Sequence, residues 1–120
     1  MSLIKLTLPL PPSSNKYWRH VAMPNGRSAT LISKEARIYK RQVALLVNSS
    51  VLIQSNIAIT VRIFRAQRSG DLDNKLKVLF DSLQGVIYAN DSQIVEIHAF
   101  RYEDKLEPRV EVEIRNLGLC

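Results

Sequence analysis

The sequence predicts an α+β domain, in which two main helices pack on one face of a small mixed β-sheet in the order β-(hairpin)-α-β-α-β-β. Two segments, residues 34–48 and 74–84, carry apolar side chains at helical spacing. An Asn25-Gly26 turn between short extended pieces of residues 16–32 predicts a hairpin. Short extended segments predict the remaining strands: residues 3–8, 57–65, 94–102 and 109–115. No linker or repeat divides the chain, so residues 1–120 are expected to form one domain.

The first strand is expected to end at Pro9, because this proline and the two that follow at residues 11 and 12 force an extended connection. Ser33 is the expected N-cap of the first helix. The apolar side of that helix is predicted to consist of Ala36, Tyr39, Val43, Leu46 and Val47. Its opposite side carries lysine and arginine.

The second helix is expected to bury a stripe of apolar side chains and to end at Gly85, a natural residue after a helix C-terminus. The stripe consists of Leu72, Leu76, Leu79, Phe80 and Leu83. In the strand of residues 57–65, alternation predicts that the core side carries Ile57, Ile59, Val61 and Ile63. In the last strand it predicts that the core side carries Val110, Val112 and Ile114. The last two strands are expected to pair antiparallel through the loop of residues 103–108.

Charge divides the chain sharply at residue 70. Glu35 is the only acidic residue before that point, against eleven lysines and arginines, so the first seventy residues carry a net charge of +10. The last fifty carry −4. A basic half of this kind favours a polyanionic partner, with DNA or RNA the first candidates.

The acidic half begins with Asp71-Leu72-Asp73-Asn74, followed by Lys75 and Lys77. Carboxylates this close repel one another, and a divalent cation relieves the repulsion. Residues i and i+2 point to the same side only in extended chain, so sharing a metal ion requires helical geometry to start near Asp73. The alternative is structural, because Asp and Asn at a helix start are ordinary caps.

Two further residues extend this candidate site. Asp91 lies in the turn after the second helix and reaches the head of that helix only if the next strand lies beside the strand that ends near Arg65. The alternative for residues 90–92 is a polar turn. Lys77 lies one turn after Asp73, either as a surface ion pair or as a cation beside a scissile phosphate. Asp81, a further turn along, is expected to be mainly structural.

Composition excludes other classes. Cys120 is the only cysteine, which rules out an internal disulfide and a cysteine-based zinc site and agrees with a cytoplasmic location. No apolar run is long enough to span a membrane, and none resembles a signal peptide, so no membrane partner is expected.

Three motifs together resemble the RusA family of Holliday-junction resolvases. Residues 8–19 (LPLPPSSNKYWR) are similar to its proline-rich N-terminal motif. Residues 71–74 with Lys77 and Asp81 resemble its central motif, and residues 90–94 its third motif, in which Asn90 stands where the family can have a second aspartate. The order, spacing and chain length agree, so the resemblance covers nearly the whole chain.

The resemblance implies a Mg²⁺-dependent endonuclease of phage or prophage ancestry that acts as a homodimer, binds four-way DNA junctions and makes paired symmetric nicks in DNA recombination and repair. It places the catalytic residues at Asp71, Asp73, Asp91 and Lys77, with the three aspartates holding one or two Mg²⁺ ions. Apolar residues without an obvious partner are candidates for the dimer interface: Leu52, Ile53, Leu117 and Leu119.

Contacts to DNA are expected from the basic half and from the start of the second helix. These residues are Lys16, Arg19, Arg27, Lys34, Arg37, Lys40, Arg41, Arg68, Asn74 and Lys75. Tyr17 and Trp18 fit either unstacked bases or the core. His20 and His98 are assigned no role. The alternative function is a non-catalytic basic DNA-binding module, and a weaker one is an RNA-binding protein or a metal-free ribonuclease.

Overall fold

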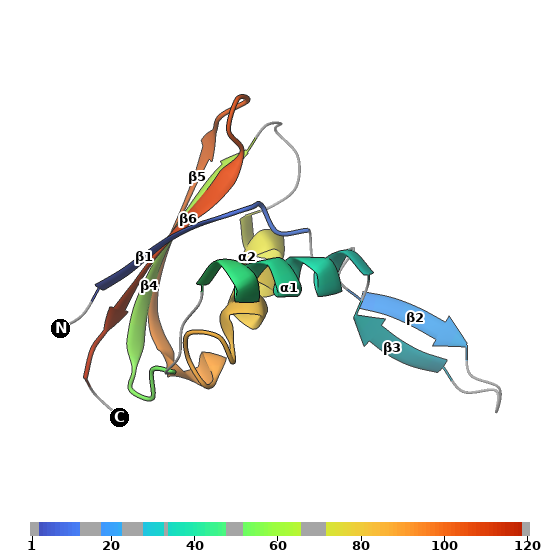
Figure 1. The fold of residues 1–120 in the computed structure, drawn as a ribbon, viewed down its shortest axis with the longest axis horizontal. Coiled ribbons are helices and arrows are strands. Elements are labelled where there is room, and N and C mark those ends of the chain that lie inside the picture. The colour runs from blue at the N-terminus through green and yellow to red at the C-terminus, as the bar shows by residue number, and fades with distance from the viewer. Residues whose placement is uncertain are drawn as a thin grey trace.

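The computed structural model describes residues 3–12, 18–22, 28–32, 34–47, 52–65 and 72–118, with side chains left out of the description at residues 18–22, 28–32 and 72–74. It is an α+β fold, as the sequence predicts. Two helices lie on one face of a four-stranded sheet, and a separate two-stranded hairpin extends away from the sheet beyond the helices (Figure 1).

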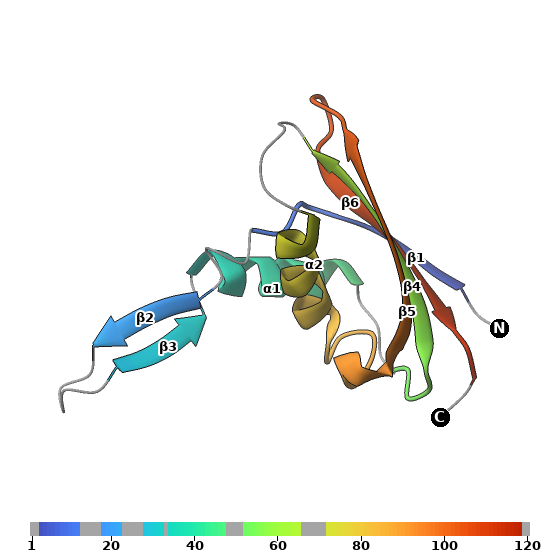
Figure 2. The same cartoon turned by 180° about the vertical axis from the view of Figure 1, so that it is seen from behind.

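The four-stranded sheet has the order β1-β6-β4-β5. Its strands are β1 (Leu3–Leu8), β4 (Ile57–Arg65), β5 (Ile94–Glu103) and β6 (Arg109–Asn116). β6 is antiparallel to both β1 and β4, whereas β4 and β5 are parallel. The prediction that the last two strands pair with each other is wrong, because β4 lies between them and both pair with it. Figure 2 shows β5 on the outer edge of the sheet.

The predicted hairpin is confirmed. β2 (Trp18–Ala22) and β3 (Ser28–Ile32) pair antiparallel, with Trp18 opposite Ile32 and Ala22 opposite Ser28. The Asn25-Gly26 turn lies outside the described residues, as does the Ser33 cap of the helix that follows.

Both predicted helices are confirmed as α1 (Lys34–Val47) and α2 (Leu72–Leu83). In α1 the predicted apolar side buries Ala36, Tyr39 and Val43, but Leu46 is 58% exposed. Val47, in the same last turn, packs against the core, so only Leu46 lies outside the buried stripe. α2 begins two residues earlier than predicted, and Gly85 after it has a φ of +82°, the left-handed conformation that ends many helices.

The core lies between the helices and the helix-facing side of the sheet. Strand alternation supplies Ile57, Ile59, Val61 and Ile63 from β4, and Val110, Val112 and Ile114 from β6, all fully or almost fully buried. Leu79 and Leu83 of α2 are buried against them, whereas Leu76 and Phe80 are partly buried. Each such side chain contributes roughly 1.5–3 kcal/mol to the free energy of folding. This packing fixes α2 antiparallel to β4.

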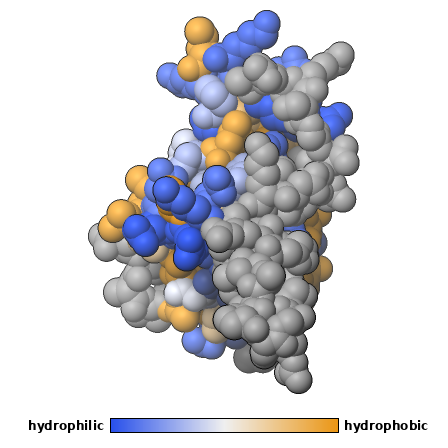
Figure 3. Space-filling model, turned by 90° about the vertical axis from the view of Figure 1, so that its right-hand side faces the viewer, coloured by the Kyte–Doolittle hydropathy of each residue, from blue (hydrophilic) through white to orange (hydrophobic). Residues whose placement is uncertain are grey.

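Seen from the side of the hairpin, the described surface is a mosaic of hydrophilic and hydrophobic side chains (Figure 3). None of the helices in the described part of the chain is long and apolar enough to cross a membrane.

Candidate active site

The acidic motif lies where the chain passes from β4 into α2. β4 ends at Arg65, and the next described residue, Leu72, is already helical. Asp71 lies outside the described residues, and the structure places the backbones of Asp73 and Asn74 in the first turn of α2 without describing their side chains. The carboxyl ends of parallel strands and the N-terminus of the helix between them commonly form ligand sites in such crossovers. The motif occupies that position.

Three basic side chains, Arg65, Lys75 and Lys77, lie near this end of α2, beside Glu103 and the acidic motif. Arg65 is only 7% exposed, and its Nη2 lies 3.9 Å from Glu103 Oε1 on the neighbouring strand. Lys75 is partly buried, and desolvation together with the nearby Arg65 lowers the pKa of its ammonium group. Lys77 is exposed. This local field suits a phosphate group or a cluster of carboxylates.

Asp91 lies at the opposite end of α2. It opens the short 3₁₀ helix Asp91–Gln93, directly before β5 begins at Ile94. Its backbone N–H donates a hydrogen bond to Gln84 Oε1 at 3.0 Å, and Gln84 directly follows the last residue of α2. The condition for Asp91 to reach the head of α2 is met in part, since the next strand lies beside β4, with Ile57 of β4 aligned with Ile94 of β5. However, this alignment brings Asp91 to the start of β4, whereas the acidic motif follows the end of β4.

The separation within one chain is large. An α-helix rises about 1.5 Å per residue, so the ten residues from Asp73 to Leu83 span about 15 Å. Mg²⁺ binds its ligand oxygens at about 2.0–2.1 Å. Within one chain, Asp91 therefore lies too far from Asp73 for the two residues to bind the same metal ion. Among the described side chains, which do not include those of Asp71 and Asp73, no group of three or more His, Cys, Asp or Glu is placed to hold a metal ion.

The turn that carries Asp91 is held tightly. Asn90 Oδ1 accepts from Ser92 N at 2.9 Å, while Asn90 N donates to Gln93 Oε1 at 2.8 Å. Gln93 Nε2 also donates to the carbonyl oxygens of Ile53 and Ser55, both at 2.8 Å. Asn90 is therefore a capping residue, and these bonds leave Asp91 exposed on a fixed turn. The sequence does not predict this role of Gln93, because its two acceptors lie 40 and 38 residues away along the chain.

A second acidic residue approaches Asp91. Burial and, next, the charge of Asp91 raise the pKa of the Asp81 carboxyl group. Burial, Asp91 and Asp81 also raise the pKa of the Tyr88 hydroxyl, which donates to Phe80 O at 2.5 Å. Asp81 Oδ2 lies 2.8 Å from Lys40 Nζ of α1. Asp81 and Asp91 therefore lie near each other at this end of α2, with Lys40 paired to Asp81.

The predicted DNA-contacting residues fall into three groups. Lys34, Arg37 and Arg41 are exposed on α1, while Lys40 is partly buried by its ion pair with Asp81. Lys75 is partly buried beside Arg65. The others lie outside the described residues, or have side chains that are not described: Lys16, Arg19, Arg27, Arg68 and Asn74.

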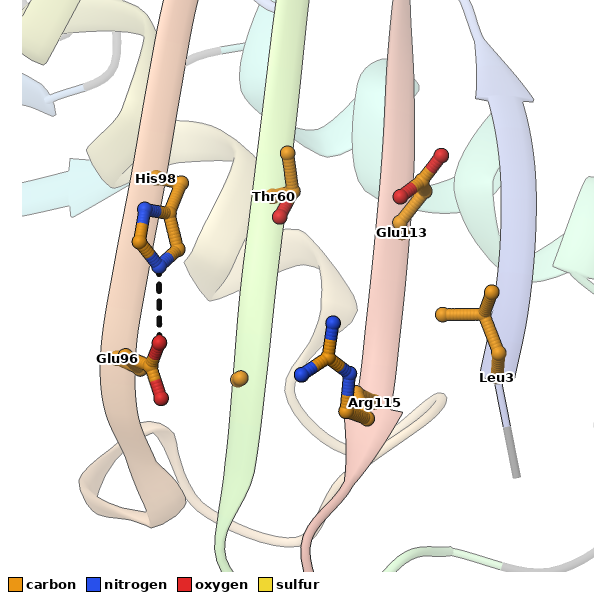
Figure 4. Close-up of a pocket in the computed structure, with 7 residues that line it drawn as sticks. Leu3, Thr60, Glu96, His98, Glu113 and Arg115 are labelled. Carbon is orange, nitrogen blue, oxygen red and sulfur yellow. Dashed lines mark hydrogen bonds and ion pairs between the residues drawn. The ribbon is translucent and has the colours of Figure 1, made fainter. Parts of the chain in front are cut away.

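A hollow on the other face of the sheet has a different character. It is lined by residues such as Leu3, Thr60, Glu113 and Arg115, and Glu96 Oε1 lies 2.9 Å from His98 Nε2 beside it (Figure 4). The helices cover the opposite face, so this hollow is separated from the acidic motif by the sheet. Its acidic and basic side chains nearly balance, which does not favour DNA.

Two comparisons relate the chain to known proteins. Residues 9–115 match the family model described as Endodeoxyribonuclease RusA. The chain is 32% identical over 123 residues to the crossover junction endodeoxyribonuclease rusA of Enterobacteria phage 82, and 31% identical to the proteins named crossover junction endodeoxyribonuclease RusA of Escherichia coli strain K12 and Shigella sonnei strain Ss046. Each of these alignments covers 98% of both chains.

Proposed function

The chain belongs to the RusA family of endodeoxyribonucleases, and from this premise we propose that it resolves four-way DNA junctions by paired, Mg²⁺-dependent nicks. It is a nuclease, as the full-length similarity to its relatives indicates. One observation carries the choice of site: the acidic motif follows the carboxyl end of a strand that is parallel to its neighbour, at the head of a helix.

The metal ligands we propose are Asp71, Asp73 and Asp91. Their carboxylate oxygens are the donors that Mg²⁺ prefers, and Asp91 is exposed on a turn that hydrogen bonds fix in place. When bound, the metal would activate water and stabilise the charge that develops on the leaving oxygen.

Lys77 is the cation we propose beside the scissile phosphate. It is exposed, and it lies four residues after Asp73 on the same side of α2. A fixed cation there opposes the negative charge that develops in the transition state. Lys34, Arg37 and Arg41, exposed on α1, would bind backbone phosphates outside the cleavage site.

The distance along α2 makes the homodimer part of the mechanism. One chain holds Asp91 and Asp73 at opposite ends of a helix, so one metal site needs Asp91 from one copy and Asp71 with Asp73 from another. A two-fold axis then generates two equivalent sites, which suits a junction with two equivalent strands to cut.

A nicking assay tests the function. We expect cleavage of a four-way junction in Mg²⁺, loss of cleavage in EDTA, and weak or no cleavage of a linear duplex of the same sequence. Binding to the junction without cleavage under every metal condition would favour the non-catalytic DNA-binding module.

Mixing two inactive variants tests the shared site. Asp73→Asn and Asp91→Asn should each abolish cleavage alone. A mixed dimer of the two has one site with both aspartates intact if the site spans two copies, so mixing should restore nicking of one strand. If each site lies within one chain, both sites of the mixed dimer remain damaged and mixing restores nothing.

A further inference from the structure

We propose that a groove between α1 and the proline-rich segment after β1 binds one unstacked DNA base, with a preference for bases that carry an amino group over thymine. The inference rests on the proposed function, because it names the part of the DNA that this side of the chain would hold. Its support is independent of the acidic motif. It comes from the shape of the groove, the polar side chains on its α1 wall and the cations beside it.

The groove is an open hollow of about 310 Å³. One wall is the segment Leu10-Pro11-Pro12, which passes beside α1 after leaving β1 (Figure 1). The other wall is α1, where Ile38 is 44% exposed. A hollow of this size lies at the lower end of the range for small-molecule sites, which suits a single base. Apolar side chains of this kind commonly pack against the flat faces of bases that have left the stack.

The two walls of the groove are tied to each other. The Tyr39 hydroxyl of α1 donates a hydrogen bond to Pro9 O at 2.8 Å, and the Tyr39 side chain is buried. Pro11 is also buried, and the proline rings fix the backbone φ of this wall. The groove therefore exists before a ligand enters it, so little conformational entropy is lost on binding.

Two polar side chains of α1 line the groove on either side of Ile38. Glu35 lies three residues before Ile38 and Gln42 four residues after it, and both are exposed. Glu35 is the only acidic residue among the first seventy, and it lies in this groove. A carboxylate there accepts a hydrogen bond from the amino group of a base, whereas thymine presents a carbonyl oxygen instead. The Gln42 amide both donates and accepts, so it suits any base.

Cations beside the groove suit the phosphates that would flank such a base. Lys34 lies four residues before Ile38 and Arg41 three residues after it, so both are neighbours of Ile38 on the surface of α1. Both side chains are exposed. The groove is thus continuous with the basic side of α1, to which the proposed function assigns backbone phosphates. Bases at the crossover of an open junction lack a stacked neighbour on one side, which lowers the cost of extruding one.

A fluorescent base tests the groove without an activity readout. Four-way junctions carrying 2-aminopurine at the crossover are mixed with protein in EDTA, and the fluorescence of this base rises when it leaves the stack. The wild type should raise it, and Ile38→Asp should not. The matched control is Leu45→Asp, which adds the same charge to α1 at a residue that is 77% exposed and does not line the groove. It should behave like the wild type.

Ile38→Asn, which adds no charge, should act like Ile38→Asp, and circular dichroism checks that every variant is folded. An equal rise in fluorescence for the wild type and both Ile38 variants would overturn the groove as a base site. A change in the sedimentation of the free protein on Ile38→Asp would also overturn it, because a second copy would then cover the groove.

Binding of short single strands tests the role of Glu35. In EDTA and at fixed salt, the wild type should bind a cytosine oligomer about fivefold more tightly than a thymine oligomer, the lower end of what one base contact supplies. Glu35→Ala should bind both more tightly, since a negative charge is lost, but should lose the preference. A purely structural role at the start of α1 would leave the ratio of the two affinities unchanged, and that result would overturn the preference.

Neither measurement requires cleavage, so the two proposals can fail separately. If the fluorescence rises as expected but the protein nicks no junction in Mg²⁺, the groove stands and the proposed function fails. If junctions are nicked but the Ile38 variants match the wild type in fluorescence, the function stands and the groove fails.

Discussion

Lys40 Nζ of α1 lies 2.8 Å from Asp81 Oδ2 of α2, so an ion pair joins the basic helix to the helix that begins with the acidic motif. Both side chains are about one third exposed. Burial lowers the pKa of Lys40 and, together with Asp91, raises that of Asp81, so each charge is desolvated as the pair forms. The net contribution to stability is therefore expected to be small.

Lys40→Met tests this contact. We expect the free energy of unfolding to fall by about 0.5–1 kcal/mol, because water still reaches the pair and weakens it. Urea denaturation of this variant, of Asp81→Asn and of the double variant measures the coupling. A coupling energy of zero would show that this ion pair does not contribute to the stability of the fold.

The salt dependence of junction binding should show which basic side chains of α1 contact DNA. Arg37→Ala with Arg41→Ala should weaken binding and flatten the slope of log K against log salt concentration, since each neutralised phosphate releases counterions. Lys40→Met is the matched control, and its smaller effect should reflect the ion pair with Asp81. Equal slopes for the wild type and the Arg37 and Arg41 double variant would mean that this face of α1 does not contact DNA.

Lys77→Ala should lower the nicking rate about 100–1,000-fold, as loss of one group that stabilises transition-state charge commonly does. Thermal stability should change little, because a surface pair at this spacing contributes only about 0.2–0.5 kcal/mol. Single-turnover nicking and a melting curve give the two readouts. A lower melting temperature with full activity would assign Lys77 a structural role.

Gln93 is expected to position Asp91. Gln93→Ala removes the donations to Ile53 O and Ser55 O, leaving partly buried carbonyl groups without these partners, and should lower the free energy of unfolding by about 1–3 kcal/mol. It should also slow nicking with little change in junction affinity. Ser92→Ala, next to it and exposed, should leave both properties close to wild type. Full activity after Gln93→Ala would show that the turn holds Asp91 without it.

Low pH should remove the stability that Asp104 contributes in the loop after β5. The hydrogen bond from Arg109 Nη1 at 2.9 Å, followed by that from Glu107 N, lowers the pKa of Asp104 from 3.8. A carboxyl group with a lower pKa in the folded state stabilises above its unfolded pKa. That stability is lost as pH falls below about 3.8. Asp104→Asn should therefore reduce the difference in stability between pH 6 and pH 3, measured by urea denaturation.

Local patterns in the sequence predicted most of the fold. Helical spacing in α1 and α2, and alternation in β4 and β6, follow from the positions of apolar side chains. The strands were predicted for the same reason, but their neighbours were not. β5 and β6 adjoin in sequence, yet each pairs with β4, because the crossover through α2 places β5 beside β4 and leaves β6 to fill the other side.

The residues that the sequence offered for the dimer interface also show that a sequence pattern does not specify which side chains are covered. Ile53 appeared to lack a partner in the sequence, but its backbone N–H donates to Ile87 O at 2.7 Å and its side chain packs against the core. Ile97 alternates like a buried strand residue and yet is 50% exposed, because β5 is the edge strand of the sheet. Whether an alternating residue is buried depends on what covers its strand.

The sequence by itself determined the chemistry available to this protein: a basic half, an acidic motif at a helix start, a lysine one turn later and a third aspartate after the helix. Only the tertiary structure decided where these groups lie. Because α2 packs antiparallel to β4, its twelve residues hold Asp73 and Asp91 at opposite ends. Because the crossover through α2 places β5 beside β4, the start of β5 carries Asp91 to the end of α2 that lies away from Asp73.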